Sequence, residues 1–144
     1  MSKHAEWVED LLGAAKANPT QENISLIECC GVGCAKRQNA FEGMETLRKQ
    51  ASNCKTRSDY ATFLRQVIPV QIEEVDDGIV MRLGKTGCTC PMASEIHANG
   101  EMLCHCTCGH EKAAWSVFFG KPVDIEIVES FLRGGKDCVI KILI

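Results

Sequence analysis

Hydrophobic residues in the first part of the chain recur at the spacing of an α-helix. Residues 4–17 carry one apolar stripe with this period, and Pro19 follows its end. Thr20 is placed to cap a second helix, whose apolar face extends to Cys30. The pattern therefore predicts two consecutive helices with a short connection at Pro19.

Two more helices are expected before the pattern changes. A third is predicted over about residues 36–51, where apolar side chains keep the helical period. The fourth has the clearest signal, because Thr56-x-x-Asp59 matches a capping box in front of a regular apolar stripe that Pro69 ends. We therefore expect residues 1–69 to form a helical half.

After Pro69 the hydrophobic pattern alternates with a period of two. Residues 70–73 and 79–83 follow it on either side of Asp76-Asp77-Gly78. Asp-Gly tolerates the positive φ that tight hairpin turns need. This segment is predicted to form a β-hairpin.

A second hairpin is predicted further along the chain. Residues 123–127 and 138–144 alternate, and the Arg-Gly-Gly segment 133–135 supplies a turn between them. Residues 109–119 have helical spacing. We expect an α+β fold in a single domain, residues 1–144: N-terminal helices packed on a small antiparallel sheet of two hairpins, with an intervening helix and a Cys-rich loop.

The chain of 144 residues contains ten cysteines, although a chain of this length can bury a stabilising core without them. No basic stretch leads into an apolar segment at the N-terminus, and no apolar run approaches the length of about 18 residues that spans a membrane. We therefore expect a cytoplasmic protein with reduced thiols and no membrane partner. The net charge of −3 and the lack of Lys/Arg runs argue against binding to nucleic acid.

Half of the cysteines lie in one stretch, residues 84–108, that shows neither period. Such a stretch inside a domain is usually functional or disordered. Thiolate and imidazole groups are preferred ligands of zinc, and thiolates also hold iron–sulfur clusters. Two C-x-C pairs in this stretch could supply four sulfurs to one ion: Cys88, Cys90, Cys104 and Cys106.

A second group of cysteines surrounds two glycines between Cys29 and Cys34. On a continuing helix Cys30 and Cys34 would share one face. Alternatively, the glycines permit a turn that brings backbone N–H groups towards an anion or a cluster. We expect this segment and the Cys-rich loop to meet and form a pocket. The predicted metal ligands are Cys30, Cys34, Cys88, Cys90, Cys104 and Cys106.

Two other functions fit the same residues. Cys108 lies at the N-terminus of the predicted 109–119 helix, where the helix dipole would lower its pKa. Cys106 or Cys108 could then act as a nucleophile with His110 as the base. A thiol redox protein would instead form reversible disulfides, Cys30 with Cys34 or Cys88 with Cys90.

The remaining cysteines and two histidines have simpler interpretations. Cys138 is in phase with the isoleucines of its predicted strand, which indicates a core position. Cys54 lies in a polar segment and is interpreted as an incidental thiol. His4 and His97 are expected on the surface.

The order of the cysteine motifs resembles that of a known family. These motifs are Glu28-Cys29-Cys30-Gly31-x-x-Cys34-Ala35, Cys88-Thr89-Cys90-Pro91, Cys104-His105-Cys106-Thr107-x-Gly109-His110, and Gly120-Lys121-Pro122-Val123-Asp124-Ile125-Glu126 followed by Ser130, Gly134-Gly135 and Cys138. Over residues 25–144 the chain resembles the L-2-amino-thiazoline-4-carboxylic acid hydrolase-like family, which is similar to the 4-vinyl-reductase type of small-molecule-binding domain. The resemblance implies a small-molecule ligand and a hydrolase acting on a cyclic, cysteine-derived amidine.

The chain departs from that family's pattern in its additional donors. Cys29 and Cys108 are extra, and His110 stands where an aromatic residue is common. Additional donors favour a metal site over a single nucleophile. We therefore predict a cytoplasmic Cys-rich small-molecule-binding domain that holds zinc or an iron–sulfur cluster, with hydrolysis of small cyclic amidines or amides by Cys106, Cys108 and His110 as the alternative.

Overall fold

Four helices precede the first strand in the computed structural model, which describes residues 2–84, 88 and 90–144. They are α1 (Lys3–Ala17), α2 (Gln21–Arg37), α3 (Ala40–Gln50) and α4 (Arg57–Val67). The predicted caps are confirmed: the Thr20 hydroxyl accepts a hydrogen bond from the backbone N–H of Asn23 at 3.2 Å, and Thr56 with Asp59 forms a capping box.

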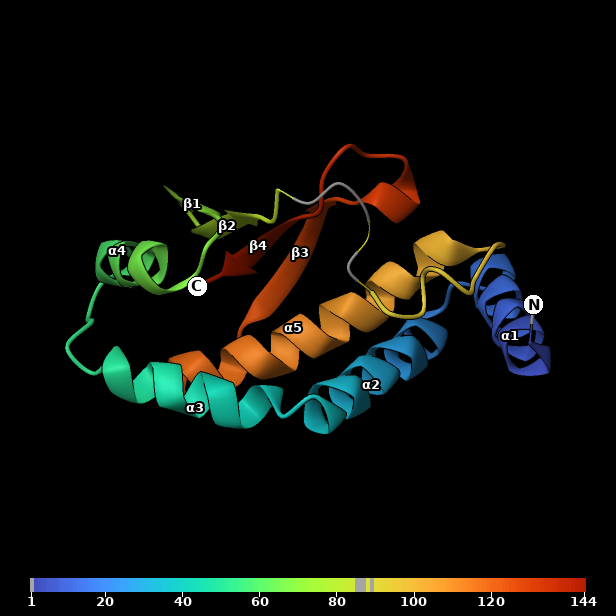
Figure 1. Ribbon diagram of the computed structural model, residues 1–144, viewed down its shortest axis with the longest axis horizontal. Helices are drawn as coiled ribbons and strands as arrows, with labels where there is room; N and C mark the ends of the chain where they lie inside the picture. The colour runs from blue at the N-terminus through green and yellow to red at the C-terminus, as the bar shows by residue number, and fades with distance from the viewer. Residues whose placement is uncertain (1, 85–87, 89) are drawn as a thin grey trace.

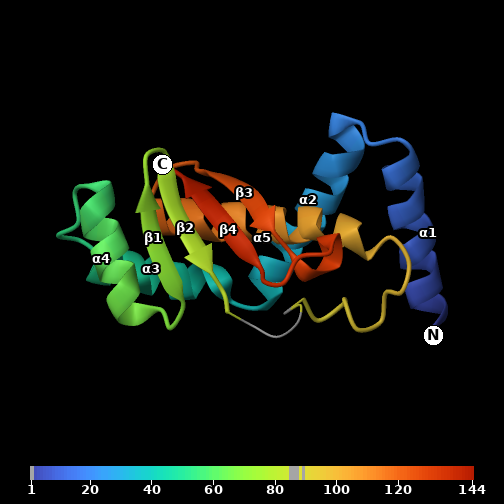
Figure 2. The same cartoon turned by 90° about the horizontal axis from the view of Figure 1, so that it is seen from above.

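The second half of the described chain contains one antiparallel sheet and a long helix. Its elements are β1 (Gln71–Val75), β2 (Gly78–Arg82), the 3₁₀ helix η1 (Gly100–Met102), α5 (Leu103–Phe119), β3 (Asp124–Glu129), the 3₁₀ helix η2 (Phe131–Arg133) and β4 (Val139–Leu143). The strand order is β1-β2-β4-β3, so pairing of β2 with β4 joins the two predicted hairpins (Figure 2). The predicted α+β class is confirmed.

Helix α5 is the layer between the sheet and the other long helices. It runs beneath the sheet and packs along α2 and α3 on its other side, while α1 and α4 lie at opposite ends of the molecule (Figure 1). Trp115 and Phe118 of α5 are buried in one core with Ile79 and Ile142 of the sheet. None of the described helices is long and apolar enough to cross a membrane.

Two helix boundaries differ from the prediction. Helix α5 begins at Leu103 rather than near residue 109, because Cys104 is buried as a small hydrophobic residue and extends the helical stripe. Helix α3 begins at Ala40 rather than near residue 36, because α2 continues to Arg37 and Asn39 then adopts a left-handed φ of 55°.

The alternative of a glycine turn in the Cys29–Cys34 segment is wrong, because α2 continues through it. The glycine at position 31 has a packing role instead. A side chain on Gly31 would overlap the Cys106 carbonyl of α5, and one on Gly109 would overlap the Glu28 carbonyl of α2. These two glycines let the helices approach closely, and the continuing helix places Cys30 and Cys34 one turn apart.

Candidate functional site

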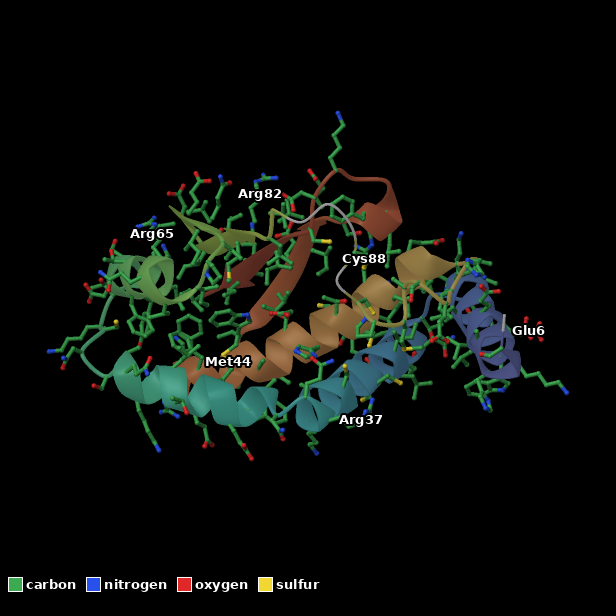
Figure 3. All side chains as sticks on the ribbon, viewed as in Figure 1. Glu6, Arg37, Met44, Arg65, Arg82 and Cys88 are labelled. Carbon is green, nitrogen blue, oxygen red and sulfur yellow. The ribbon has the colours of Figure 1, made fainter. Side chains whose placement is uncertain are left out.

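The Cys-rich loop is fixed to the helical part of the protein by α1. The Glu9 carboxylate accepts hydrogen bonds from the backbone N–H groups of His97 and Ala98, the second at 2.9 Å. These bonds hold the pKa of Glu9 below its ordinary value. Cys88, labelled in Figure 3, lines a cavity together with residues of the sheet and of α5.

An inner cavity of about 100 Å³ lies between the sheet and the first half of α5. Its walls are mainly apolar, with Met81 and Ile140 contributed by the sheet. Four cysteines from the loop, the helix and the last segment also line it: Cys88, Cys90, Cys104 and Cys138. Small-molecule pockets usually measure about 300 Å³ or more, so this cavity suits only a very small ligand.

An outer cavity of about 160 Å³ adjoins the first on the side of α2. Cys34, Cys90, Cys106 and His110 line it. Helix positions explain this set, because Cys106 and His110 are one turn apart on α5 and Cys34 lies on the neighbouring α2. The predicted meeting of the loop with the Cys29–Cys34 segment therefore occurs here.

The two cavities share one wall, which includes an acidic residue. Cys90, Thr107 and Glu111 line both of them. The carboxylate of Glu111 accepts a hydrogen bond of 2.9 Å from the Trp115 indole N–H. Burial raises the pKa of Glu111 above its ordinary value, and its hydrogen bond to Trp115 opposes this shift only in part.

The thiol of Cys106 lies near three other thiols, those of Cys30, Cys34 and Cys90, and these four form the thiol cluster. The pKa of Cys106 is raised to about 11, mainly by burial and further by the negative charges of ionised Cys90, Cys34 and Cys30, while the positive charge of Arg37 acts in the opposite direction. Thiols from α2, the loop and α5 are thus close enough to repel one another when ionised. At neutral pH, Cys106 is a protonated thiol in the absence of a bound cation.

Two thiols of the inner cavity, Cys88 and Cys138, also have a raised pKa. Burial is the main cause of the raised pKa of Cys88, with Cys90 and Cys104 adding like charge. Burial likewise raises the pKa of Cys138. The Cys104 thiol donates a hydrogen bond of 3.2 Å to the Ser130 hydroxyl, the buried polar residue beside this cavity.

The predicted catalytic set is divided by the fold. Cys106 and His110 share the outer cavity, whereas the Cys108 thiol lies 3.5 Å from the Ile125 carbonyl oxygen and packs on the main core. The expected lowering of the Cys108 pKa is wrong. The helix begins at Leu103, so Cys108 is not at its N-terminus, and burial raises the pKa instead.

The predicted metal ligands lie around these two cavities, but their side chains do not converge on one point within the described residues. Within residues 2–84, 88 and 90–144, no three His, Cys, Asp or Glu side chains are arranged to hold a metal ion. Cys34, Cys90 and Cys106 share the outer cavity, Cys88 and Cys104 line the inner one, and Cys30 lies exposed near Cys106. Binding of an ion would require thiols to rotate inward.

Two residues of the site were not identified from the sequence. Cys138 lines the inner cavity because it precedes β4 beside the loop, and its apolar strand pattern suggested only a core position. Glu111 could have been identified from its spacing. It lies four residues before Trp115, which is one helical turn, in a segment whose other side chains are mostly uncharged.

Comparisons with known proteins show the fold and the family. The model of a family described as "Family of unknown function (DUF6144)" matches residues 2–144. No curated protein matches the chain. Among solved structures, the chain is similar to a trafficking protein particle complex subunit 3 from Naegleria fowleri covalently bound to palmitic acid, with a TM-score of 0.50, 11% identity, and coverage of 97% of this chain and 94% of that one.

Proposed function

The chain belongs to DUF6144, a family of unknown function, and from its thiol cavities we propose that it is a small-molecule-binding domain whose clustered cysteines hold zinc or an iron–sulfur cluster. The supporting observation is the convergence of thiols from three segments on Cys106, whose pKa burial and neighbouring charge raise to about 11. A soft cation would neutralise the repulsion and favour the thiolate form.

The donors around the outer cavity favour a single ion over a cluster. Zinc binds four sulfur or nitrogen ligands in a tetrahedron. Cys34, Cys90, Cys106 and His110 supply three sulfurs and one imidazole, and all four line the same small space. Cys30, one turn before Cys34, is the alternative fourth ligand.

The inner cavity is the proposed place for the small molecule. Its apolar walls and volume of about 100 Å³ suit a ligand of few atoms next to the metal. The structurally similar trafficking subunit carries palmitic acid. A long acyl chain needs much more space than this cavity offers, so our proposal is a short ligand.

Zinc affinity of cysteine variants tests the metal proposal. Cys34→Ser and Cys106→Ser should each weaken zinc binding by about tenfold or more, because each removes a thiolate ligand. The affinity is measured at neutral pH by competition with a chromophoric chelator.

Two matched variants serve as controls for the lost thiol. Cys29 is exposed and Cys54 lines a different cavity, so Cys29→Ser and Cys54→Ser should bind zinc like the unmodified protein. Equal affinity in all four variants would reject the site. A brown protein whose visible absorption is lost in Cys106→Ser would instead identify an iron–sulfur cluster on the same residues.

Hydrolysis of a cyclic amidine or amide is a second proposal, supported by the position of Cys106 and His110 in one cavity. In this reaction the Cys106 sulfur would add to the ring carbon while His110 accepts the thiol proton; the ring bond to that carbon then breaks, and its leaving atom takes the proton from His110. Water, deprotonated by His110, would then add to the same carbon and release the product and the Cys106 thiol. A metal held by the neighbouring thiols would supply Lewis acidity at this carbon. Turnover of L-2-amino-thiazoline-4-carboxylate, followed by chromatography, should be lost in Cys106→Ser and retained in Cys108→Ser. Loss in neither variant would contradict this role.

A further inference from the structure

A cavity distant from the Cys106 cluster lies where α3, α4 and the C-terminal end of α5 meet, and Cys54 is the one cysteine among its described lining residues. It measures about 640 Å³, and Arg48, Lys49, Tyr60 and Phe119 are among its lining residues. A second hollow of about 350 Å³ shares Tyr60 and Phe119 with it. Because they share these residues, we describe the two hollows together as the basic groove. Helix α4, which contributes to both, lies at the end of the molecule opposite α1 (Figure 1). Both volumes fall in the range of small-molecule sites.

Positive charge is concentrated in this groove although the whole chain carries −3. Its lining includes five cations from four segments and one acidic residue, Glu45. The cations are Arg48, Lys49, Lys55, Arg57 and Lys121. The ion pairs found within the described residues involve other cations, so none of these five is paired there.

The nearby carboxylate of Asp59 offsets part of the charge of Lys55. It is directed to the backbone, where it accepts hydrogen bonds from the N–H groups of Lys55 at 2.9 Å and Thr56 at 3.0 Å. Among the lining residues that the structure describes, Glu45 is the one acidic side chain, so five basic side chains leave an excess of positive charge there.

Two of the cations are held in place by the fold. The Arg57 guanidinium donates to the carbonyls of Val75, Asp76 and Ile144 at 3.2, 2.7 and 2.8 Å, and its buried Nε has no partner within the described chain. The Arg48 guanidinium lies against Gly120, where it occupies the space of a side chain. Fixed guanidinium groups attract anions with a smaller entropic cost than mobile lysines do.

Aromatic rings form the floor where the two hollows join. Tyr60 and Phe119 meet edge to face with ring centroids 5.0 Å apart, and the buried Phe118 supports both rings at 5.7 and 4.8 Å. Both lining rings are half-buried, so part of each ring surface is open to the groove. Such surfaces bind planar rings by stacking.

We propose that this groove binds a nucleotide, with its phosphates among the basic side chains and its base on Tyr60 and Phe119. Phosphate groups form strong charge-assisted hydrogen bonds with guanidinium and ammonium groups. The base would account for the aromatic floor, which a free phosphate does not need. This site is independent of the proposed metal site.

Calorimetric titration of the full chain with ATP at low ionic strength tests the proposal, because salt screens exposed charges. ATP is expected to bind more tightly than tripolyphosphate or adenosine alone. The double variant Lys49→Glu, Lys121→Glu should weaken ATP binding by about tenfold or more, since two charge-assisted contacts become repulsive.

Control variants separate the groove from general charge effects and from unfolding. Lys36→Glu changes an exposed lysine on α2 and should leave ATP binding unchanged. Tyr60→Phe keeps the ring and should bind ATP normally, whereas Tyr60→Leu should bind weakly while its circular dichroism spectrum shows a folded protein. Absence of ATP binding, equal weakening by Lys36→Glu, or equal affinity for ATP and tripolyphosphate would overturn the proposal.

Discussion

Cys106 links the burial of the thiol cluster to its chemistry. Its position on α5 opposite α2 follows from the packing of Gly31 against the Cys106 backbone. The same burial, together with three neighbouring thiols, keeps its pKa near 11. A thiol in this environment is a poor nucleophile at neutral pH, and it becomes a ligand when a cation displaces its proton.

The pKa of Cys106 predicts a loss of stability at alkaline pH in the metal-free protein. The ordinary thiol pKa is 9.0 and the folded value is about 11, so the unfolded chain ionises first as pH rises. The free energy of unfolding should therefore fall from about pH 9 and level off above about pH 11. Urea unfolding of reduced protein at several pH values measures this slope.

Cys106→Ser is the matched variant for this prediction. It lacks the ionising group, so its free energy of unfolding should fall less over the same pH range. Other buried thiols, among them Cys88 and Cys138, retain their own smaller contributions in both proteins. If the free energy of unfolding falls equally with pH in the variant and in the unmodified protein, the pKa of Cys106 is not raised by folding.

The close crossing of α2 and α5 determines which thiols meet. The sequence predicted most elements well, and the Thr56 capping box and both hairpins are confirmed. It did not predict the crossing, because Gly31 was compatible with a turn and Gly109 gave no signal of its own until the partner helix was known. The first turns of α5 were also not predicted, because the cysteines there were assigned mainly to a metal-binding loop, whereas Cys104 is a buried core residue of the helix.

A pair of glycine substitutions tests this crossing. A methyl group on Gly109 would overlap the Glu28 carbonyl, so Gly109→Ala should lower the free energy of unfolding by about 1–3 kcal/mol. Gly43 lies within α3 with no atom within 4 Å of an added Cβ, so Gly43→Ala should raise it by about 0.5–1 kcal/mol. Chemical denaturation measures the free energy of unfolding of both variants. Equal destabilisation by Gly109→Ala and Gly43→Ala would contradict the close packing of α2 on α5.

At the scale of the whole molecule, the strand order assembles the inner cavity. Pairing of β2 with β4 brings the segment around Cys138 beside the loop that carries Cys88 and Cys90. The sequence predicted one small antiparallel sheet of two hairpins, but it did not predict which strands join them, because no local pattern contains this long-range pairing. The same architecture separates the thiol cavities from the basic groove at the far end of α5.

Metal binding by the thiol cluster can be measured on the protein as purified. Elemental analysis of anaerobically purified protein, combined with titration of its free thiols, tests it. We predict about one zinc ion, or iron with inorganic sulfide, per chain, and fewer than ten reactive thiols until the metal is removed. A metal-free folded protein in which all ten cysteines titrate as free thiols would contradict the account.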